Sequence, residues 1–270
     1  MTLSEATLTE IEMTELRDCA HVMTDAARAV ILPLFRSGLV SDNKDAAGFD
    51  PVTEADRAAE IAMRAVLADL RPMDSILGEE FGEREGSSGL QWVLDPIDGT
   101  RGFISGTPTW GVLVSVRDAS GPLYGLIDQP YIGERFEGGF GLAKMTGPLG
   151  AQVLGTKKTS DLAEATILTT FPEVGVEADA VGFRSVAERC KLTRYGMDCY
   201  GYALLAAGQV DLVVEAGLSA YDIQAPIAVI EAAGGIVTDW QGGPAHDGGR
   251  ALAAANAEIH AQAMAILSKY

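Results

Sequence analysis

The sequence predicts an α+β fold built from two consecutive sub-domains. The first part opens with two segments whose apolar residues have helical spacing, followed by short apolar runs separated by glycines. From about residue 166, short apolar runs alternate with helical segments instead. The 270 residues suffice for one large domain or two modest ones. We therefore expect an N-terminal α+β sub-domain over residues 1–150 and a C-terminal α/β sub-domain over residues 151–270.

In the N-terminal part, residues 9–37 have the apolar spacing of one long amphipathic helix, which stops at Gly38. A polar loop over residues 41–50 leads to a second helix, which begins near Thr53, covers residues 54–70 and ends before Pro72. The apolar runs that follow predict strands of a mostly antiparallel sheet, at residues 75–77, 91–94, 110–116 and 123–127.

The C-terminal part alternates strands and helices after a junction between residues 147 and 162. The predicted strands cover residues 167–170, 192–195, 212–214 and 236–239. The predicted helices cover residues 179–190, 200–208 and 223–233.

The charge balance excludes a general nucleic-acid binder. The chain has 38 Asp and Glu against 20 Lys and Arg, a net charge of −18, whereas clustered basic residues bind a polyphosphate backbone. Residues 1–15 do not have the basic start and apolar core of a secretory signal, and no apolar run approaches the roughly 18 residues that span a bilayer. The sequence has three cysteines and no CxxC pair among Cys19, Cys190 and Cys199, so we expect a protein of the reducing cytoplasm. From the charge balance and the absence of a long apolar run, we expect neither a nucleic-acid nor a membrane partner.

The segment WVLDPIDGT, residues 92–100, is an apolar strand that runs into two carboxylates. Asp95, Asp98 and the Ile97 carbonyl between them offer the hard oxygen ligands that Mg²⁺ prefers. If Gly99 and Thr100 open a helix, their amides could hold a phosphate oxygen. The alternative is a β-turn in which Asp98 and Gly99 supply only turn chemistry.

Three further acidic segments have both a functional and a structural interpretation. Glu79 and Glu80 follow an apolar strand, but they could form a solvated acidic loop. Asp56 lies three residues after Thr53, where the pair could simply cap a helix. Asp222 precedes an apolar helix that ends in two glycines, and it could be only an N-cap residue.

Taken in order, these four segments resemble the inositol monophosphatase superfamily of Mg²⁺-dependent, lithium-sensitive phosphatases. The family pattern is T-x-x-D, then G-E-E, then D-P-[IL]-D-G-T, and finally [WY]-D before a helix that ends in A-G-G. All four motifs are present in this order, and the resemblance extends over residues 16–268. It implies a layered αβαβα sandwich of the inositol monophosphatase and fructose-1,6-bisphosphatase type, commonly a homodimer.

The resemblance also implies a ligand set for two to three Mg²⁺ ions. Glu79, Asp95 and the Ile97 carbonyl would hold one ion. A second would lie between Asp95, Asp98 and Asp222. A third, looser ion would bind Glu79 through water.

The same resemblance assigns the catalytic and phosphate-binding groups. Asp56 and Thr100, beside Glu79, would orient and deprotonate the water that attacks phosphorus in line. Gly99 and Thr100 would bind the phosphate. The first sub-domain would thus carry the metal motifs, and the second the last ligand and the substrate pocket.

The residues after the metal loop differ from those of inositol phosphatases, which usually continue D-G-T-x-N-F-x-H. Here Arg101 follows without that Asn or His, and this run, with residues 197–202 and 211–218, is similar to the histidinol-phosphate phosphatase branch. Asp198 and Glu215 would complement the amine and imidazole of such a substrate. Arg101 could contact the substrate or a neighbouring subunit, or form a structural salt bridge.

We therefore expect a Mg²⁺-dependent phosphomonoesterase that hydrolyses L-histidinol phosphate to L-histidinol in histidine biosynthesis. The first alternative is an inositol-1-monophosphatase or sugar-phosphate phosphatase with the same metals and a different pocket. The second is a non-catalytic relative with a binding or regulatory role. The carboxylate set disfavours the second alternative, since like charges crowded without metal repel one another.

Overall fold

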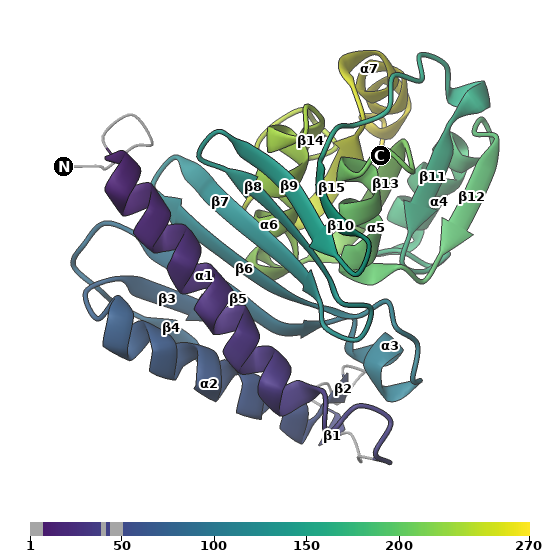
Figure 1. Cartoon of the computed structure of the whole chain (residues 1–270). Coiled ribbons are helices and arrows are strands. Elements are labelled where there is room, and N and C mark those ends of the chain that lie inside the picture. Colours follow the sequence, from purple (N-terminus) through teal and green to yellow (C-terminus); the bar gives the residue numbers. More distant parts are fainter. Residues whose placement is uncertain (1–7, 39–41, 44–50) are drawn as a thin grey trace.

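The computed structural model describes residues 8–38, 42–43 and 51–270, and within them helices and sheets form alternating layers. Helices α1 and α2 cover one face of an eight-stranded sheet, and α5 and α6 lie between this sheet and a five-stranded one. Helices α4 and α7 pack on the far side of the second sheet (Figure 1). The predicted α+β class and the αβαβα layering are therefore confirmed.

The two outer helices, α1 (Glu10–Ile31) and α2 (Glu54–Leu70), each begin with a capping box, formed by Thr9 and by Thr53. The second helix has the predicted bounds. The first ends six residues earlier than predicted, because Pro33 has no N–H to continue the hydrogen-bond ladder and turns follow it. The predicted polar loop over residues 41–50 lies largely outside the described residues, as do residues 1–7.

The first sheet has the strand order β10-β9-β8-β7-β6-β5-β3-β4 and is antiparallel except for the parallel pair β3 and β5. Its strands are β3 (Ser75–Gly78), β4 (Gly82–Arg84), β5 (Gln91–Asp98), β6 (Gly111–Asp118), β7 (Gly121–Gln129), β8 (Glu134–Gly139), β9 (Leu142–Gly147) and β10 (Gly150–Val153). A separate pair joins β1 (Asp42–Asn43) and β2 (Pro51–Val52).

The second sheet has the order β12-β11-β13-β15-β14, with parallel and antiparallel pairs. Its strands are β11 (Thr166–Thr169), β12 (Leu192–Tyr195), β13 (Leu212–Leu218), β14 (Ile236–Thr238) and β15 (Gly249–Ala254). The remaining helices are α3 (Thr100–Ile104), the 3₁₀ helix η2 (Leu162–Glu164), α4 (Glu177–Ala187), α5 (Asp198–Ala206), α6 (Ala220–Ala232) and α7 (Ala257–Leu267). The proposed division at residue 150 falls at the first residue of β10.

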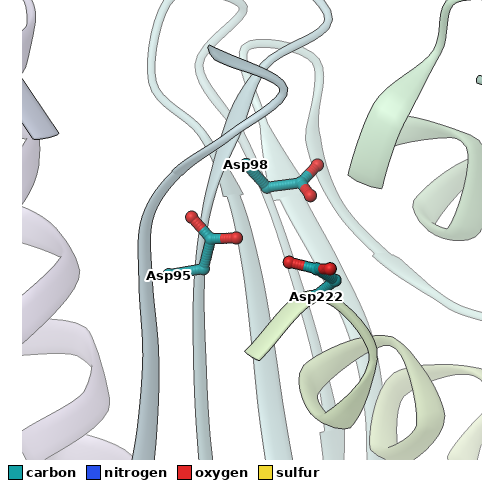
Figure 2. Close-up of side chains that lie close together, drawn as sticks. All are labelled: Asp95, Asp98 and Asp222. Carbon is teal, nitrogen blue, oxygen red and sulfur yellow. The ribbon is translucent and has the colours of Figure 1, made fainter. Parts of the chain in front are cut away.

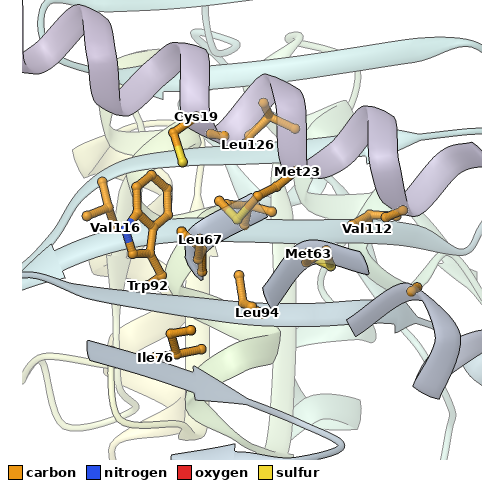
Figure 3. Packing of buried hydrophobic residues seen from close by; sticks show 14 of the residues in the cluster. Cys19, Met23, Met63, Leu67, Ile76, Trp92, Leu94, Val112, Val116 and Leu126 are labelled. Carbon is orange, nitrogen blue, oxygen red and sulfur yellow. The ribbon is translucent and has the colours of Figure 1, made fainter. Parts of the chain in front are cut away.

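A buried core beneath α1 and α2 fixes strand β5. Met23, Met63, Trp92 and Leu94 are inaccessible to solvent and pack together there (Figure 3). The Trp92 indole also donates a 2.9 Å hydrogen bond to Asp74. Because each such side chain stabilises the fold by roughly 1.5–3 kcal/mol, the strand that carries Asp95 and Asp98 is held firmly.

Helix α6 packs directly on strands β7 and β8 because two glycines remove the side chains between them. A Cβ atom at Gly125 would collide with the backbone of Ala225, and one at Gly138 with the backbone of Val229. This close contact sets the distance between α6 and the first sheet. No helix within the described ranges is long and apolar enough to cross a membrane.

Candidate active site

The acidic motifs converge at one edge of the first sheet. Strands β3 and β5 are parallel, so Glu79, directly after β3, lies at the same edge as Asp95 and Asp98. The first turn of α6 supplies Asp222 from the other half of the chain. Carboxylate oxygens of Asp95, Asp98 and Asp222 lie within 4.8 Å of one another (Figure 2).

An irregularity in β5 allows Asp95 and Asp98 to face the same point. Residues three apart on a regular strand point to opposite faces of the sheet. The pairing of β5 with β6 shifts register between these two residues, where Pro96 has no N–H for the ladder. The register shift therefore lets the carboxylates of Asp95 and Asp98 point toward the same place at the end of β5.

Asp95 is a buried carboxylate with three other carboxylates as neighbours. It is 2% exposed, and its Oδ1 atom has no hydrogen-bond partner. Burial raises the pKa of Asp95 well above its usual value, and the carboxylates of its neighbours Glu79, Asp98 and Asp222 raise that pKa further. An oxygen-liganded cation would satisfy the orphaned atom and relieve this repulsion, so the residues fit a divalent metal.

Glu60 orients the Glu79 segment and was not singled out in the sequence analysis. Its buried carboxylate accepts hydrogen bonds from the backbone of Glu80 at 2.7 Å and of Phe81 at 3.3 Å. The Arg64 guanidinium donates to it at 2.7 Å. One feature of the sequence could have indicated this role: Glu60 lies on the apolar stripe of α2, one turn before Met63, where a charged residue is not expected unless it has a partner.

Asp56 caps α2 and also lies beside Thr100. Its Oδ2 atom accepts hydrogen bonds from the Thr53 backbone at 2.8 Å and the Thr53 hydroxyl at 2.5 Å, which caps α2. Its Oδ1 atom is 3.5 Å from the Thr100 hydroxyl, which also donates to the Ile97 carbonyl at 3.1 Å. The predicted pair Asp56 and Thr100 is thus brought together next to the strand end.

A cavity of about 760 Å³ opens beside the cluster, between α3, the start of α5, β13 and the loop after β11. Of the residues predicted for the site, those lining it are Asp98, Gly99, Thr100, Arg101, Asp198, Glu215 and Asp222. Gly99 has a φ of 81° and is the N-cap residue of the short helix α3, which begins at Thr100, so these two residues open a helix.

Asp198 lies against the metal loop. It has a φ of 46°, which is unusual for a residue with a side chain, and its carboxylate carbon would be only 2.7 Å from a Cβ at Gly99. Burial raises the pKa of Asp198, while the Thr109 hydroxyl and the Arg101 charge oppose that shift. The Thr109 hydroxyl donates to Asp198 at 3.3 Å.

Glu215 is buried at the other side of the cavity, and its carboxylate accepts several hydrogen bonds. It accepts hydrogen bonds from the Thr169 hydroxyl at 3.0 Å, the Thr170 amide at 2.6 Å and the Thr170 hydroxyl at 2.9 Å. Burial nevertheless raises the pKa of Glu215 to about 7, because desolvation outweighs the hydrogen bonds that favour the charged form.

The backbone of Cys199 joins the two halves of the site. Its N–H donates a 2.6 Å hydrogen bond to Asp98, so the start of α5 orients a carboxylate of β5. Burial and the nearby carboxylate of Asp98 raise the pKa of the Cys199 thiol well above its usual value. A thiol held protonated is a poor nucleophile, which disfavours cysteine chemistry here.

The fold and site define a layered α+β protein whose buried acidic cluster opens into a polar cavity. Residues 12–270 match the sequence model of the inositol monophosphatase family. The chain is 39% identical to the chloroplastic bifunctional phosphatase IMPL2 of Arabidopsis thaliana, over 88% of this chain and 68% of that protein. It is 34% identical to a histidinol-phosphatase of Streptomyces coelicolor, over 93% and 96% of the two chains.

A solved structure of an inositol monophosphatase from Zymomonas mobilis superposes with a TM-score of 0.84 and 37% identity, covering 97% of this chain and all of that one. The chain therefore belongs to the inositol monophosphatase family, and it is a phosphatase. The predicted resemblance is confirmed. Enzymes of this family are generally metal-dependent, in agreement with the acidic cluster.

Proposed function

We propose that this phosphatase hydrolyses L-histidinol phosphate to L-histidinol, a step of histidine biosynthesis, with two to three Mg²⁺ ions. The observation that carries the proposal is the pair of carboxylates on the cavity walls, the buried Glu215 and the half-buried Asp198. An amine and an imidazole behind the phosphate would place positive charge beside them, which a neutral polyol cannot do. The histidinol-phosphatase name of the Streptomyces relative supports the same substrate.

The proposed metal ligands are the carboxylates of the convergent edge and one carbonyl. They are Glu79, Asp95, the Ile97 carbonyl, Asp98 and Asp222. Bound Mg²⁺ would supply charge neutralisation for the phosphate and the leaving oxygen and would acidify water. The orphaned Oδ1 atom of Asp95 is the direct support for this assignment.

The chain's own groups would position the substrate and move one proton. Asp56, oriented by Thr53 and adjacent to the Thr100 hydroxyl, would accept the proton of the attacking water. Glu79 would help to fix the position of that water. Gly99 and Thr100 would bind phosphate oxygens through their amides, and Arg101 would bind the phosphate from the cavity wall.

The alternative substrate is an inositol or sugar phosphate. The Zymomonas structure is described as an inositol monophosphatase, and the Arabidopsis relative is called bifunctional. A polyol would need neutral hydrogen bonds from the cavity, and the Thr170 hydroxyl on its wall could accept one. A non-catalytic role has less support, since the crowded carboxylates of the cluster destabilise a protein that binds no metal.

The substrate is tested by phosphate release from histidinol phosphate, inositol phosphate, fructose bisphosphate and adenosine bisphosphate. We expect the highest kcat/KM for histidinol phosphate. Asp198→Asn should lower that kcat/KM about ten- to several-hundredfold, mainly through KM, and spare a small uncharged phosphate ester. Because both substrates are assayed on one preparation, differences in active fraction cancel. Equal losses on the two substrates would favour the inositol or sugar-phosphate alternative.

Lithium gives a separate test of the second metal position. We expect Li⁺ at millimolar levels to inhibit by occupying the position between Asp98 and Asp222, and a large excess of Mg²⁺ to inhibit likewise. Steady-state phosphate release against Li⁺ concentration measures this. Insensitivity to both ions would show that this position is built differently.

The proposed cellular setting is a cytoplasmic homodimer that acts on a small phosphate monoester without nucleic-acid or membrane partners. Cys19, Cys190 and Cys199 are free thiols, as expected in a reducing compartment. Sedimentation of the purified protein would measure the oligomeric state directly.

A further inference from the structure

Two side chains from opposite halves of the molecule meet at the mouth of the cavity. The guanidinium carbon of Arg101, on α3, lies 4.7 Å from the centre of the Phe171 ring. Phe171 belongs to the loop of residues 170–176, which joins β11 of the second sheet to α4. Both residues line the cavity, so their contact bridges its mouth.

Arg101 is the only basic residue among the described residues that line the cavity. The other charged residues there are Asp98, Glu173, Asp198, Glu215 and Asp222. Among the charged side chains of this wall, only the guanidinium attracts a phosphate dianion by itself, without a bound metal. Arg101 is also exposed, and ordering a long exposed side chain in one rotamer costs conformational entropy. Its use in binding phosphate therefore depends on what fixes its position.

Phe171 can fix that position because its loop is anchored at both ends. At the start, Glu215 accepts hydrogen bonds from the amide and hydroxyl of Thr170. At the end, the Asp179 carboxylate accepts a 2.9 Å hydrogen bond from the Val176 amide and a 2.7 Å bond from Arg250. The Phe171 ring is 38% exposed, but the backbone that carries it is not free to swing away.

Stacking on a ring also suits the geometry of phosphate binding. A cation–π contact places the guanidinium over the flat face of the aromatic ring. The guanidinium N–H groups lie in the plane of the guanidinium, so an arginine over a ring can still direct N–H groups at phosphate oxygens and bind two of them. A lysine at the same place could not combine the two contacts.

We propose that Phe171 is a positioning residue that holds the Arg101 guanidinium across the cavity mouth, where it binds the phosphate of the incoming monoester. The proposal deepens the proposed function and rests on its phosphatase activity, but not on the identity of the alcohol. Phe171 itself need not touch the substrate. Its effect should reach the phosphate only through Arg101.

The test is a double-variant cycle on the Mg²⁺-loaded enzyme, with p-nitrophenyl phosphate as substrate and inorganic phosphate as a calorimetric ligand. Phe171→Leu should raise KM and the phosphate Kd about two- to fivefold, as expected for an exposed cation–π contact, with a smaller change in kcat. Phe171→Tyr keeps the ring face and should restore both values. Arg101→Ala should raise them about tenfold or more, and Phe171→Leu should add nothing to that variant.

A matched control lies outside the cavity. The Arg36 guanidinium is stacked 4.6 Å from the Tyr131 ring, so Tyr131→Leu removes a similar contact and should leave KM and phosphate binding unchanged. The inference is overturned if the two single effects add in the double variant, or if Phe171→Tyr is as weak as Phe171→Leu. If the enzyme hydrolysed p-nitrophenyl phosphate but not histidinol phosphate, the proposed substrate would be wrong, and the proposed role of Phe171 would be unaffected. Phosphate calorimetry decides it even for a variant with low turnover.

Discussion

Asp95 and Glu215 are both buried carboxylates of the same site, but their surroundings differ in one respect. Asp95 has an oxygen without a partner and stands among Glu79, Asp98 and Asp222, all of the same charge. Glu215 accepts hydrogen bonds from Thr169 and Thr170. A buried acceptor left unpaired carries its full desolvation cost, whereas hydrogen bonds offset part of that cost for a paired one. The difference indicates that Asp95 is placed for a ligand, while Glu215 also holds the cavity wall.

The largest expected effect is on Asp95. We expect Asp95→Asn to lower turnover at least about a hundredfold, because the proposed role of Asp95 is to bridge two metals. The same variant should leave the metal-free protein as stable as the wild type or more so, since it removes a repelling charge. Phosphate release and thermal unfolding without metal measure the two effects.

Asp128 provides the matched control for Asp95. It is equally buried, but the Arg28 and Arg135 guanidiniums bind it at 2.7 and 2.8 Å. Asp128→Asn should lower the free energy of unfolding by about 3 kcal/mol or more, because it leaves buried positive charge without its partner. If Asp95→Asn destabilised the metal-free protein as much as Asp128→Asn, Asp95 would be a structural carboxylate like Asp128 and not one placed to bind a metal.

A smaller effect on stability is expected from substitution of Glu60, whose carboxylate, like that of Asp128, has hydrogen-bond partners. Glu60→Ala should lower the free energy of unfolding by about 2 kcal/mol, because the Glu80 and Phe81 amides and Arg64 lose a charged acceptor. It should also weaken Mg²⁺ binding, since Glu79 loses its support. Urea denaturation and Mg²⁺ calorimetry measure these changes. Glu177→Ala, which removes an exposed partner of Arg184, is the control and should cost less than about 1 kcal/mol.

The smallest effect concerns pH. Glu215 has a pKa of about 7 in the folded protein against a usual value of 4.5. Between these two values the folded state binds more protons than the unfolded state, so this residue makes stability fall as pH rises. Glu215→Gln cannot ionise and should remove that contribution, so that metal-free wild type loses about 1 kcal/mol per pH unit relative to the variant between pH 4.5 and 7. Parallel stability curves would show that the pKa of Glu215 is not raised.

Sequence patterns predicted the elements with strong periodicity and missed those without it. α2 and β12 have the predicted bounds: α2 carries an apolar stripe between the Thr53 cap and Pro72, and β12 is a short run that ends at Gly196. Strands β9 and β10 were not expected, since β10 is exposed along its whole length and β9 does not alternate between buried and exposed residues. For α7, the Asn256 cap was the available signal, but its alanine-rich sequence has weak amphipathic contrast.

The candidate site was predictable where short motifs carry it and not where support comes from afar. Asp95, Asp98 and Asp222 were expected to converge, and their side chains do so. The roles of Glu60 and Phe171 depend on contacts with segments about 20 and 70 residues away in the chain, which no local pattern encodes. Sequence spacing thus identifies the groups that meet a ligand better than those that hold these groups in place.

The glycines beneath α6 have a consequence for how the enzyme would work. Because Gly125 and Gly138 let α6 rest on the backbone of β7 and β8, Asp222 cannot separate from Asp95 by a rotation of one half against the other. The arrangement is preorganised, so ligand binding would spend little conformational entropy on assembling it. Adding one methyl group at Gly138 would push α6 away from the sheet at Val229 and so move the Asp222 carboxylate in the first turn of the same helix, without touching any group that meets the substrate.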